Sequence, residues 1–147
     1  MKKKFLLNYK DLLSFMPYKY PLLLVDKIIS IKKNIFIKSF KIVKKDDFFL
    51  SKHFFLNSVY PGVLILEFLH QTSFVLLYKN KILKNKNKNF YLAKIIYAKF
   101  FYVIKSDDVM IGNVSIIKKS LNTYVFYGKV LVNGRIICSA SFICAIK

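Results

Sequence analysis

Apolar residues follow one another at helical spacing through the middle of the chain. Residues 61–79 are almost continuously apolar, so they predict one long helix that is buried over most of its surface. Pro61 and Gly62 open this segment, and a proline suits the first turn of a helix because its missing N–H has no partner there in any case. A shorter apolar face at residues 8–16, with Asn8 as its cap, predicts a short helix near the N-terminus.

The rest of the chain carries apolar runs of the kind that form strands. Before the long helix, residues 22–32 and 35–43 predict two strands around a polar turn. After it, four long runs predict strands at residues 90–104, 108–119, 122–132 and 135–146. The Asn133-Gly134 pair between the last two runs is the strongest hairpin signal in the chain. Together these elements predict an α+β fold, with the helix laid along an antiparallel sheet of about six strands in one domain covering residues 1–147.

Length and composition fit a single folded unit outside the membrane. The chain has 147 residues, of which 55% are hydrophobic, and its 4 glycines and 3 prolines leave little material for a flexible linker. The first apolar run ends at Asn8 and is too short for a secretion signal. The long apolar helix contains Glu67, His70 and Gln71, which argues against a membrane span. We therefore expect a soluble, cytoplasmic protein with no membrane partner.

Lysine dominates the charge of the chain. The net charge is +19, and Arg135 is the only arginine. Such a surface attracts acidic partners, and nucleic acid and an acidic carrier protein are both candidates. The codon usage of an AT-rich genome would also favour lysine, and this explanation of the charge involves no acidic partner. Because arginine is the preferred side chain for base readout, its scarcity argues against nucleic acid, and we expect no nucleic-acid partner.

The two cysteines, Cys138 and Cys144, lie six residues apart on a predicted strand. An extended chain separates such residues by roughly 20 Å, which is too far for a disulfide between them. We expect both thiols to be reduced and buried, as in a cytosolic protein. Neither belongs to a metal-ligand spacing, and we expect no metal site.

The segment from His53 to Gln71 gathers groups that can carry chemistry. An imidazole such as that of His53 can accept a proton, and a carboxyl in apolar surroundings, as expected for Glu67, tends to stay protonated and can donate one. Glu67 and Gln71 lie four residues apart on one face of the predicted helix. The helix start at Gly62 presents backbone N–H groups to an oxygen that carries partial negative charge. Structural alternatives remain open, because a histidine before a helix is usually structural or solvated, and a glutamate in an apolar helix often lies at its wet edge.

This segment resembles the active-site motif of the β-hydroxyacyl-acyl-carrier-protein dehydratases of bacterial fatty-acid synthesis, the FabZ type. The residues at the spacing of that family are His53, Phe54, Pro61, Gly62, Glu67 and Gln71. The related dehydratase–isomerases carry aspartate where Glu67 stands, so the resemblance favours a dehydratase without isomerase activity. Residues 16–26 resemble the second signature of the family, with Tyr18 in place of a histidine. The departures near His53 are Lys52, which replaces a glycine, and the loop residues Phe55, Leu56 and Ser58.

The resemblance implies a hot-dog fold, in which a curved sheet wraps a long helix, and a dehydration reaction. The substrate would be a (3R)-3-hydroxyacyl chain held as a thioester on acyl carrier protein, and the product the trans-2-enoyl thioester, in the elongation cycle of type II fatty-acid biosynthesis. His53 would take the C2 proton, Glu67 would protonate the leaving hydroxyl, Gly62 N–H would bind the thioester carbonyl and Gln71 would hold Glu67. The reaction would need no cofactor. In the family, the histidine and the glutamate of one site come from different subunits of a dimer, and dimers often assemble as hexamers.

Other functions stay open at this point. A hot-dog acyl-thioester hydrolase would share the fold and the oxygen-binding helix start, and would use the carboxylate with water. A basic nucleic-acid-binding module would bind RNA or DNA in a strongly salt-dependent way. An inactive form of the dehydratase is a further alternative, because the loop around His53 departs from the motif of the family.

Overall fold

The computed structural model describes residues 5–54, 56–83 and 87–147. In chain order these residues form α1 (Tyr9–Leu13), β1 (Lys27–Lys32), β2 (Phe36–Ile42), the short 3₁₀-helix η1 (Leu50–Lys52), α2 (Gly62–Lys79), β3 (Phe90–Phe100), β4 (Val109–Lys119), β5 (Thr123–Val132) and β6 (Arg135–Ile146). The loop residue Phe55, one of the departures from the family motif, lies outside the described part of the chain.

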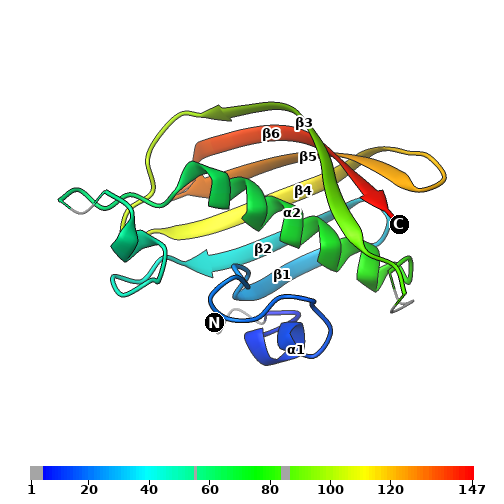
Figure 1. Ribbon diagram of the computed structural model, residues 1–147, viewed down its shortest axis with the longest axis horizontal. Coiled ribbons are helices and arrows are strands. Elements are labelled where there is room, and N and C mark those ends of the chain that lie inside the picture. The colour runs from blue at the N-terminus through cyan, green and yellow to red at the C-terminus, as the bar shows by residue number, and fades with distance from the viewer. Residues whose placement is uncertain (1–4, 55, 84–86) are drawn as a thin grey trace.

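The strands build one antiparallel sheet of six strands in the order β1-β2-β4-β5-β6-β3. Figure 1 shows α2 lying along one face of this sheet, while α1 lies beside β1. The turn between β5 and β6 has positive φ at both Asn133 (51°) and Gly134 (76°), as a two-residue hairpin turn requires. The predicted hairpin and the predicted α+β, hot-dog architecture are therefore confirmed.

Small residues allow α2 to approach the sheet closely. At Gly112 in β4, a Cβ atom would lie 2.7 Å from Phe68 Cε1 and 2.6 Å from Ser39 Oγ, so only glycine fits there. The Thr72 hydroxyl donates to Phe68 O at 2.7 Å, which leaves Ser39 Oγ to donate to Thr72 Oγ1 at 2.8 Å. Since β2, β4 and α2 are joined at this point by packing and hydrogen bonds, the orientation of α2 on the sheet is fixed.

Two strand boundaries differ by several residues from the sequence-based expectation, in each case where the chain makes a long-range contact. The strand expected at residues 22–32 begins at Lys27, because the backbone groups of Leu22 and Leu24 bind the side chain of Gln71 instead of a neighbouring strand. The strand expected at 90–104 ends at Phe100, after which the chain turns towards α2 and Ile104 O accepts from Tyr60 N at 2.7 Å. In both places a long-range contact replaces the ladder of the sheet.

One edge of the sheet is apolar and open. β3 pairs with β6 on one side only, and all but two of its residues are exposed. Its exposed large apolar side chains continue into the segment that follows and are Tyr91, Leu92, Ile95, Ile96, Tyr97, Phe100, Phe101, Tyr102 and Val103. An exposed apolar edge strand is a template for pairing with a further strand, and a large apolar patch commonly marks an interface.

The cysteines lie on β6, and both are free and buried. Burial raises the pKa of the Cys138 thiol to about 11 and also raises the pKa of Cys144. Both thiols are therefore neutral and unreactive near pH 7. Within the described ranges, no helix has the length and apolar character needed to cross a membrane.

Candidate active site

His53 lies at the end of η1, in the loop that leads to α2, and its side chain is half-buried. Its Nδ1 atom is 2.7 Å from the carbonyl oxygen of Val59. A carbonyl oxygen can only accept, so Nδ1 carries the hydrogen and Nε2 keeps a free lone pair. The ring also lies 4.0 Å from the ring of Phe54, measured between centroids. These contacts hold the imidazole with Nε2 ready to accept a proton.

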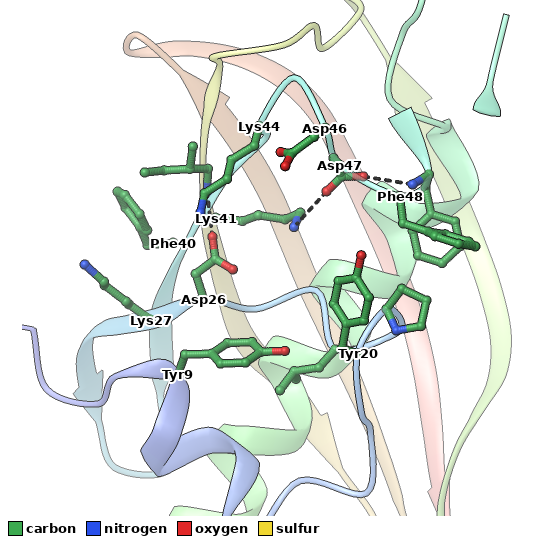
Figure 2. A pocket seen from close by; sticks show the side chains of 14 residues that line it. Tyr9, Tyr20, Asp26, Lys27, Phe40, Lys41, Lys44, Asp46, Asp47 and Phe48 are labelled. Atoms are coloured by element: carbon green, nitrogen blue, oxygen red, sulfur yellow. Dashed lines mark hydrogen bonds and ion pairs between the residues drawn. The ribbon is translucent and has the colours of Figure 1, made fainter. Parts of the chain in front are cut away.

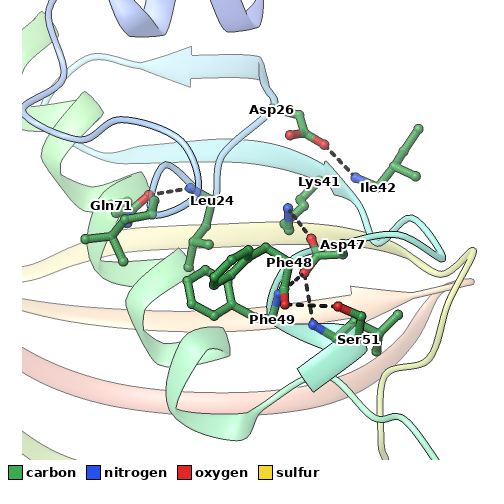
Figure 3. Close-up of polar contacts among 11 residues, drawn as sticks. Leu24, Asp26, Lys41, Ile42, Asp47, Phe48, Phe49, Ser51 and Gln71 are labelled. Carbon is green, nitrogen blue, oxygen red and sulfur yellow. Dashed lines mark hydrogen bonds and ion pairs between the residues drawn. The ribbon is translucent and has the colours of Figure 1, made fainter. Parts of the chain in front are cut away.

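The loop before His53 is anchored by Asp47. Its Oδ1 atom accepts from Phe49 N at 3.0 Å and from Leu50 N at 3.1 Å, which caps the start of η1 (Figure 3). Its Oδ2 atom lies 3.4 Å from Nζ of Lys41, a lysine that is almost fully buried on β2. This ion pair ties the loop that carries His53 to the sheet.

The start of α2 offers an unpaired backbone N–H. Pro61 is the N-cap of the helix, one position before the first-turn position that the sequence predicts, and no side chain caps the helix there. Among the described residues, none accepts a hydrogen bond from the Gly62 amide. The ring of Phe100 lies against this glycine, because a Cβ atom would come within 3.2 Å of Phe100 Cε1. The helix start can therefore bind an oxygen that carries negative charge, with β3 close beside it.

Glu67 and Gln71 are joined as their spacing predicts, since Gln71 Nε2 donates to Glu67 Oε1 at 3.0 Å. The amide of Gln71 also donates to Leu22 O at 2.8 Å. Its oxygen accepts from Leu24 N, also at 2.8 Å (Figure 3). Three hydrogen bonds therefore lock Gln71 between α2 and the segment before β1. The Glu67 side chain stays 25% exposed, so its carboxyl is held on one side and open on another.

Two titratable groups face Glu67 from other elements. The Tyr18 hydroxyl is partly buried, and this burial, with a smaller contribution from the nearby Glu67 carboxyl, raises its pKa to about 12. Burial also raises the pKa of Cys144 on β6, with a smaller contribution from Glu67. Both groups remain neutral near pH 7 and add no charge next to the carboxyl.

The single chain joins some of the predicted residues by hydrogen bonds and does not join His53 to them. Gly62, Glu67 and Gln71 lie on α2, whereas His53 lies in the preceding loop and makes no hydrogen bond or ion pair with Glu67 within the chain. His70 was not among the predicted site residues, although its Nδ1 atom lies 3.4 Å from Glu67 Oε2. The spacing of three residues on a helix was the signal in the sequence that could have found it.

A hollow of about 520 Å³ lies at another place in the fold, between α1, β2 and the loop that contains Asp47. Figure 2 shows Tyr9 and Tyr20 on one side of it and Lys44 and Asp47 on the other. Its charged groups already serve the structure, because Asp47 binds Lys41 and η1, and Asp26 Oδ2 accepts from Ile42 N at 2.8 Å. Burial raises the pKa of Asp26. Neither His53 nor Glu67 lines this hollow.

Metal ligands do not gather in the described parts of the chain: no three His, Cys, Asp or Glu side chains there are close enough to hold an ion together. What the site offers is a fixed imidazole, a partly exposed carboxyl and a free amide at a helix start. These groups are suited to proton transfer next to a carbonyl group.

A family model and curated relatives point to the same protein family. The FabA-like domain family matches residues 16–141 of the chain. The 3-hydroxyacyl-[acyl-carrier-protein] dehydratase FabZ of Shewanella woodyi is 34% identical over 139 residues, which cover 95% of this chain and 91% of the relative. The FabZ dehydratase of Haemophilus influenzae is 36% identical over 136 residues, which cover 92% of this chain and 91% of the relative.

Solved structures share the fold at lower sequence identity. The dehydratase heterocomplex ApeI:P from Xenorhabdus doucetiae matches with a TM-score of 0.76 and 15% identity, covering 90% of this chain and 88% of that chain. A hypothetical thioesterase with coenzyme A from Streptococcus pneumoniae TIGR4 matches with a TM-score of 0.64 and 14% identity, covering 82% and 84%. These likenesses bear on the fold alone, whereas the family match and the FabZ relatives extend over most of the sequence. The chain therefore belongs to the FabA-like family, among its FabZ-type 3-hydroxyacyl-[acyl-carrier-protein] dehydratases.

Proposed function

We propose that this chain, acting as a single hot-dog domain, dehydrates (3R)-3-hydroxyacyl-acyl-carrier-protein to the trans-2-enoyl thioester in the elongation cycle of type II fatty-acid biosynthesis. The observation that carries the proposal is the hydrogen bond from His53 Nδ1 to Val59 O, at 2.7 Å, because it leaves Nε2 as a base of fixed orientation. Identities of 34% and 36% to FabZ dehydratases, over most of the chain, support the choice of reaction.

The reaction begins when His53 Nε2 removes the proton from C2 of the substrate. The electron pair moves towards the thioester carbonyl, and the negative charge that develops on its oxygen is stabilised by Gly62 N–H and the positive end of the α2 dipole. The C3–O bond then breaks as protonated Glu67 gives its proton to the leaving hydroxyl, which departs as water while the C2–C3 double bond forms. Gln71 keeps the carboxyl in place through its bond to Oε1.

The proposal includes a second copy of the chain, because His53 and Glu67 make no hydrogen bond or ion pair with each other within one copy. The open edge at β3 is suited to pairing with the same edge of another copy around a two-fold axis. This edge borders the site, since Phe100 lies against Gly62 and Ile104 O accepts from Tyr60 N. We propose a homodimer in which His53 of one copy lies beside Glu67 of the other. Three such dimers can assemble further into a hexamer.

The remaining features concern partners and location. The net charge of +19 suits an acidic carrier protein. The proposed reaction involves neither nucleic acid nor a membrane, needs no cofactor and belongs in the cytoplasm.

The nature of the product distinguishes dehydration from thioester hydrolysis. The purified protein is incubated with a 3-hydroxyacyl carrier-protein thioester, and mass spectrometry of the carrier is combined with an assay for free thiol. We expect the acyl group to lose one water while it stays attached to the carrier. Release of free carrier thiol without an enoyl product would favour the hydrolase, and no change in the substrate would favour an inactive protein.

A further inference from the structure

His70 is a buried histidine beside the proposed acid. It follows Glu67 by three residues on α2, so both side chains lie on one face of the helix. Its Nδ1 atom is 3.4 Å from Glu67 Oε2, and the residue is only 4% exposed. Its ring stacks on the ring of Phe90 in β3, with centroids 4.9 Å apart and an angle of 11° between the ring planes. The imidazole is therefore fixed by the helix on one side and by the edge strand on the other.

The surroundings of the ring determine which nitrogen carries the hydrogen. Nε2 of His70 is buried and has no hydrogen-bond partner in the described part of the chain. A hydrogen on Nε2 would be a buried donor without an acceptor, which is more costly than a buried lone pair without a donor. A hydrogen on Nδ1, by contrast, has Glu67 Oε2 as its acceptor. His70 is therefore the Nδ1–H tautomer and donates to Glu67.

Both oxygens of the Glu67 carboxyl are then held. Oε1 accepts from Gln71 Nε2 at 3.0 Å, and Oε2 accepts from His70 Nδ1 at 3.4 Å. A carboxyl oxygen can take part in two hydrogen bonds, so each keeps a free site for the transferred proton or for the substrate. Two donors at different positions prevent the carboxyl from rotating about its terminal bond, while 25% of the Glu67 side chain remains exposed.

We propose that His70 is a positioning residue, which orients the Glu67 carboxyl towards the hydroxyl group that leaves as water. This inference rests on the proposed function and adds a residue to which that proposal gives no role. Orientation matters because a proton donor displaced by a fraction of a bond length from its productive position loses much of its effect. His70 itself touches neither the thioester nor the leaving group.

A matched pair of variants separates the hydrogen bond from the packing. His70→Phe keeps an aromatic ring that can stack on Phe90 but has no donor, whereas His70→Asn places an amide nitrogen where Nδ1 stands but has no ring. We expect His70→Phe to lower kcat about 10-fold with KM unchanged, and His70→Asn to restore most of that loss. Thermal melts confirm that each variant is folded. Wild-type kcat in His70→Phe, or an equal loss in both variants, would overturn the inference.

Nitrogen-15 NMR of the histidines tests the hydrogen bond in the wild-type protein, without reliance on a variant at position 70. The chain has two histidines, and the spectrum of His53→Ala assigns the other. We expect the hydrogen of the His70 ring to lie on Nδ1, and a hydrogen on Nε2 with none on Nδ1 would contradict the inference whether or not the variants fold. If the wild-type protein fails to dehydrate its substrate, the proposed function fails; if it is active and His70→Phe is equally active, only the role of His70 fails.

Discussion

Replacement of His53 by alanine lowers kcat/KM for 3-hydroxyacyl thioesters by about 10² to 10⁴, the usual contribution of a general base. The reason is that no other imidazole can reach the C2 proton, since His70 is buried and bonded to Glu67. The half-buried position of His53 in a loop means that its loss removes little packing. Steady-state kinetics, with a thermal melt to confirm the fold, measures the effect.

The neighbouring lysine provides the control for this variant. Lys52 precedes His53 at the end of η1, and its side chain is exposed. Lys52→Ala changes the same loop without removing a proton-transfer group, so we expect kcat/KM close to the wild-type value. Full activity in His53→Ala would show that another group is the base.

The second prediction with a large expected effect is that a charged residue placed in the β3 edge prevents assembly and lowers activity. We expect Ile95→Glu, at a residue that is 44% exposed, to prevent the pairing of two edges because a carboxylate would have to be buried in the interface. The variant should elute as a monomer and lose activity about 10²-fold or more, because in the proposed shared site each copy then lacks the proton-transfer group of its partner. Size-exclusion chromatography with light scattering and the dehydration assay measure the two results on one sample.

Ile117→Glu is the matched control, because Ile117 is 62% exposed on β4, away from the edge. It introduces the same charge at an exposed apolar position, and we expect it to leave both the mass of the assembly and the activity unchanged. An active monomer in Ile95→Glu would mean that one copy contains a complete site.

Much of the fold could be predicted because its signals are local. The helix expected at 61–79 begins one residue later, and the Asn133-Gly134 hairpin is found as expected, since both depend on neighbouring residues. The start of β1 was wrong because Gln71, 47 positions along the chain from Leu24, binds the backbone there. The placement of β3 beside β6 could not be predicted from the sequence either, because it depends on how strands distant in the chain pair.

In the candidate site, too, local contacts could be predicted from the sequence and long-range or loop contacts could not. The spacing of Glu67 and Gln71 anticipates their hydrogen bond, because residues four apart meet on a helix. The acceptor for His53, the carbonyl of Val59, depends on the path of an irregular loop and has no signal in the sequence. His70 sits among apolar helix residues, where burial in the core alone would also account for it. Its spacing of three residues from Glu67 permits a contact, and the distance between the two side chains establishes it.

The most direct test of the shared site mixes two inactive variants. His53→Ala and Glu67→Gln are produced together in equal amounts, and native mass spectrometry confirms that mixed dimers form. In a mixed dimer, one site has lost both groups and the other retains both. Random pairing makes half of the dimers mixed, and one of their two sites is intact, so we predict recovery of about a quarter of the wild-type activity. Activity no higher than that of the separate variants, with mixed dimers present, would contradict a site built from His53 of one copy and Glu67 of the other.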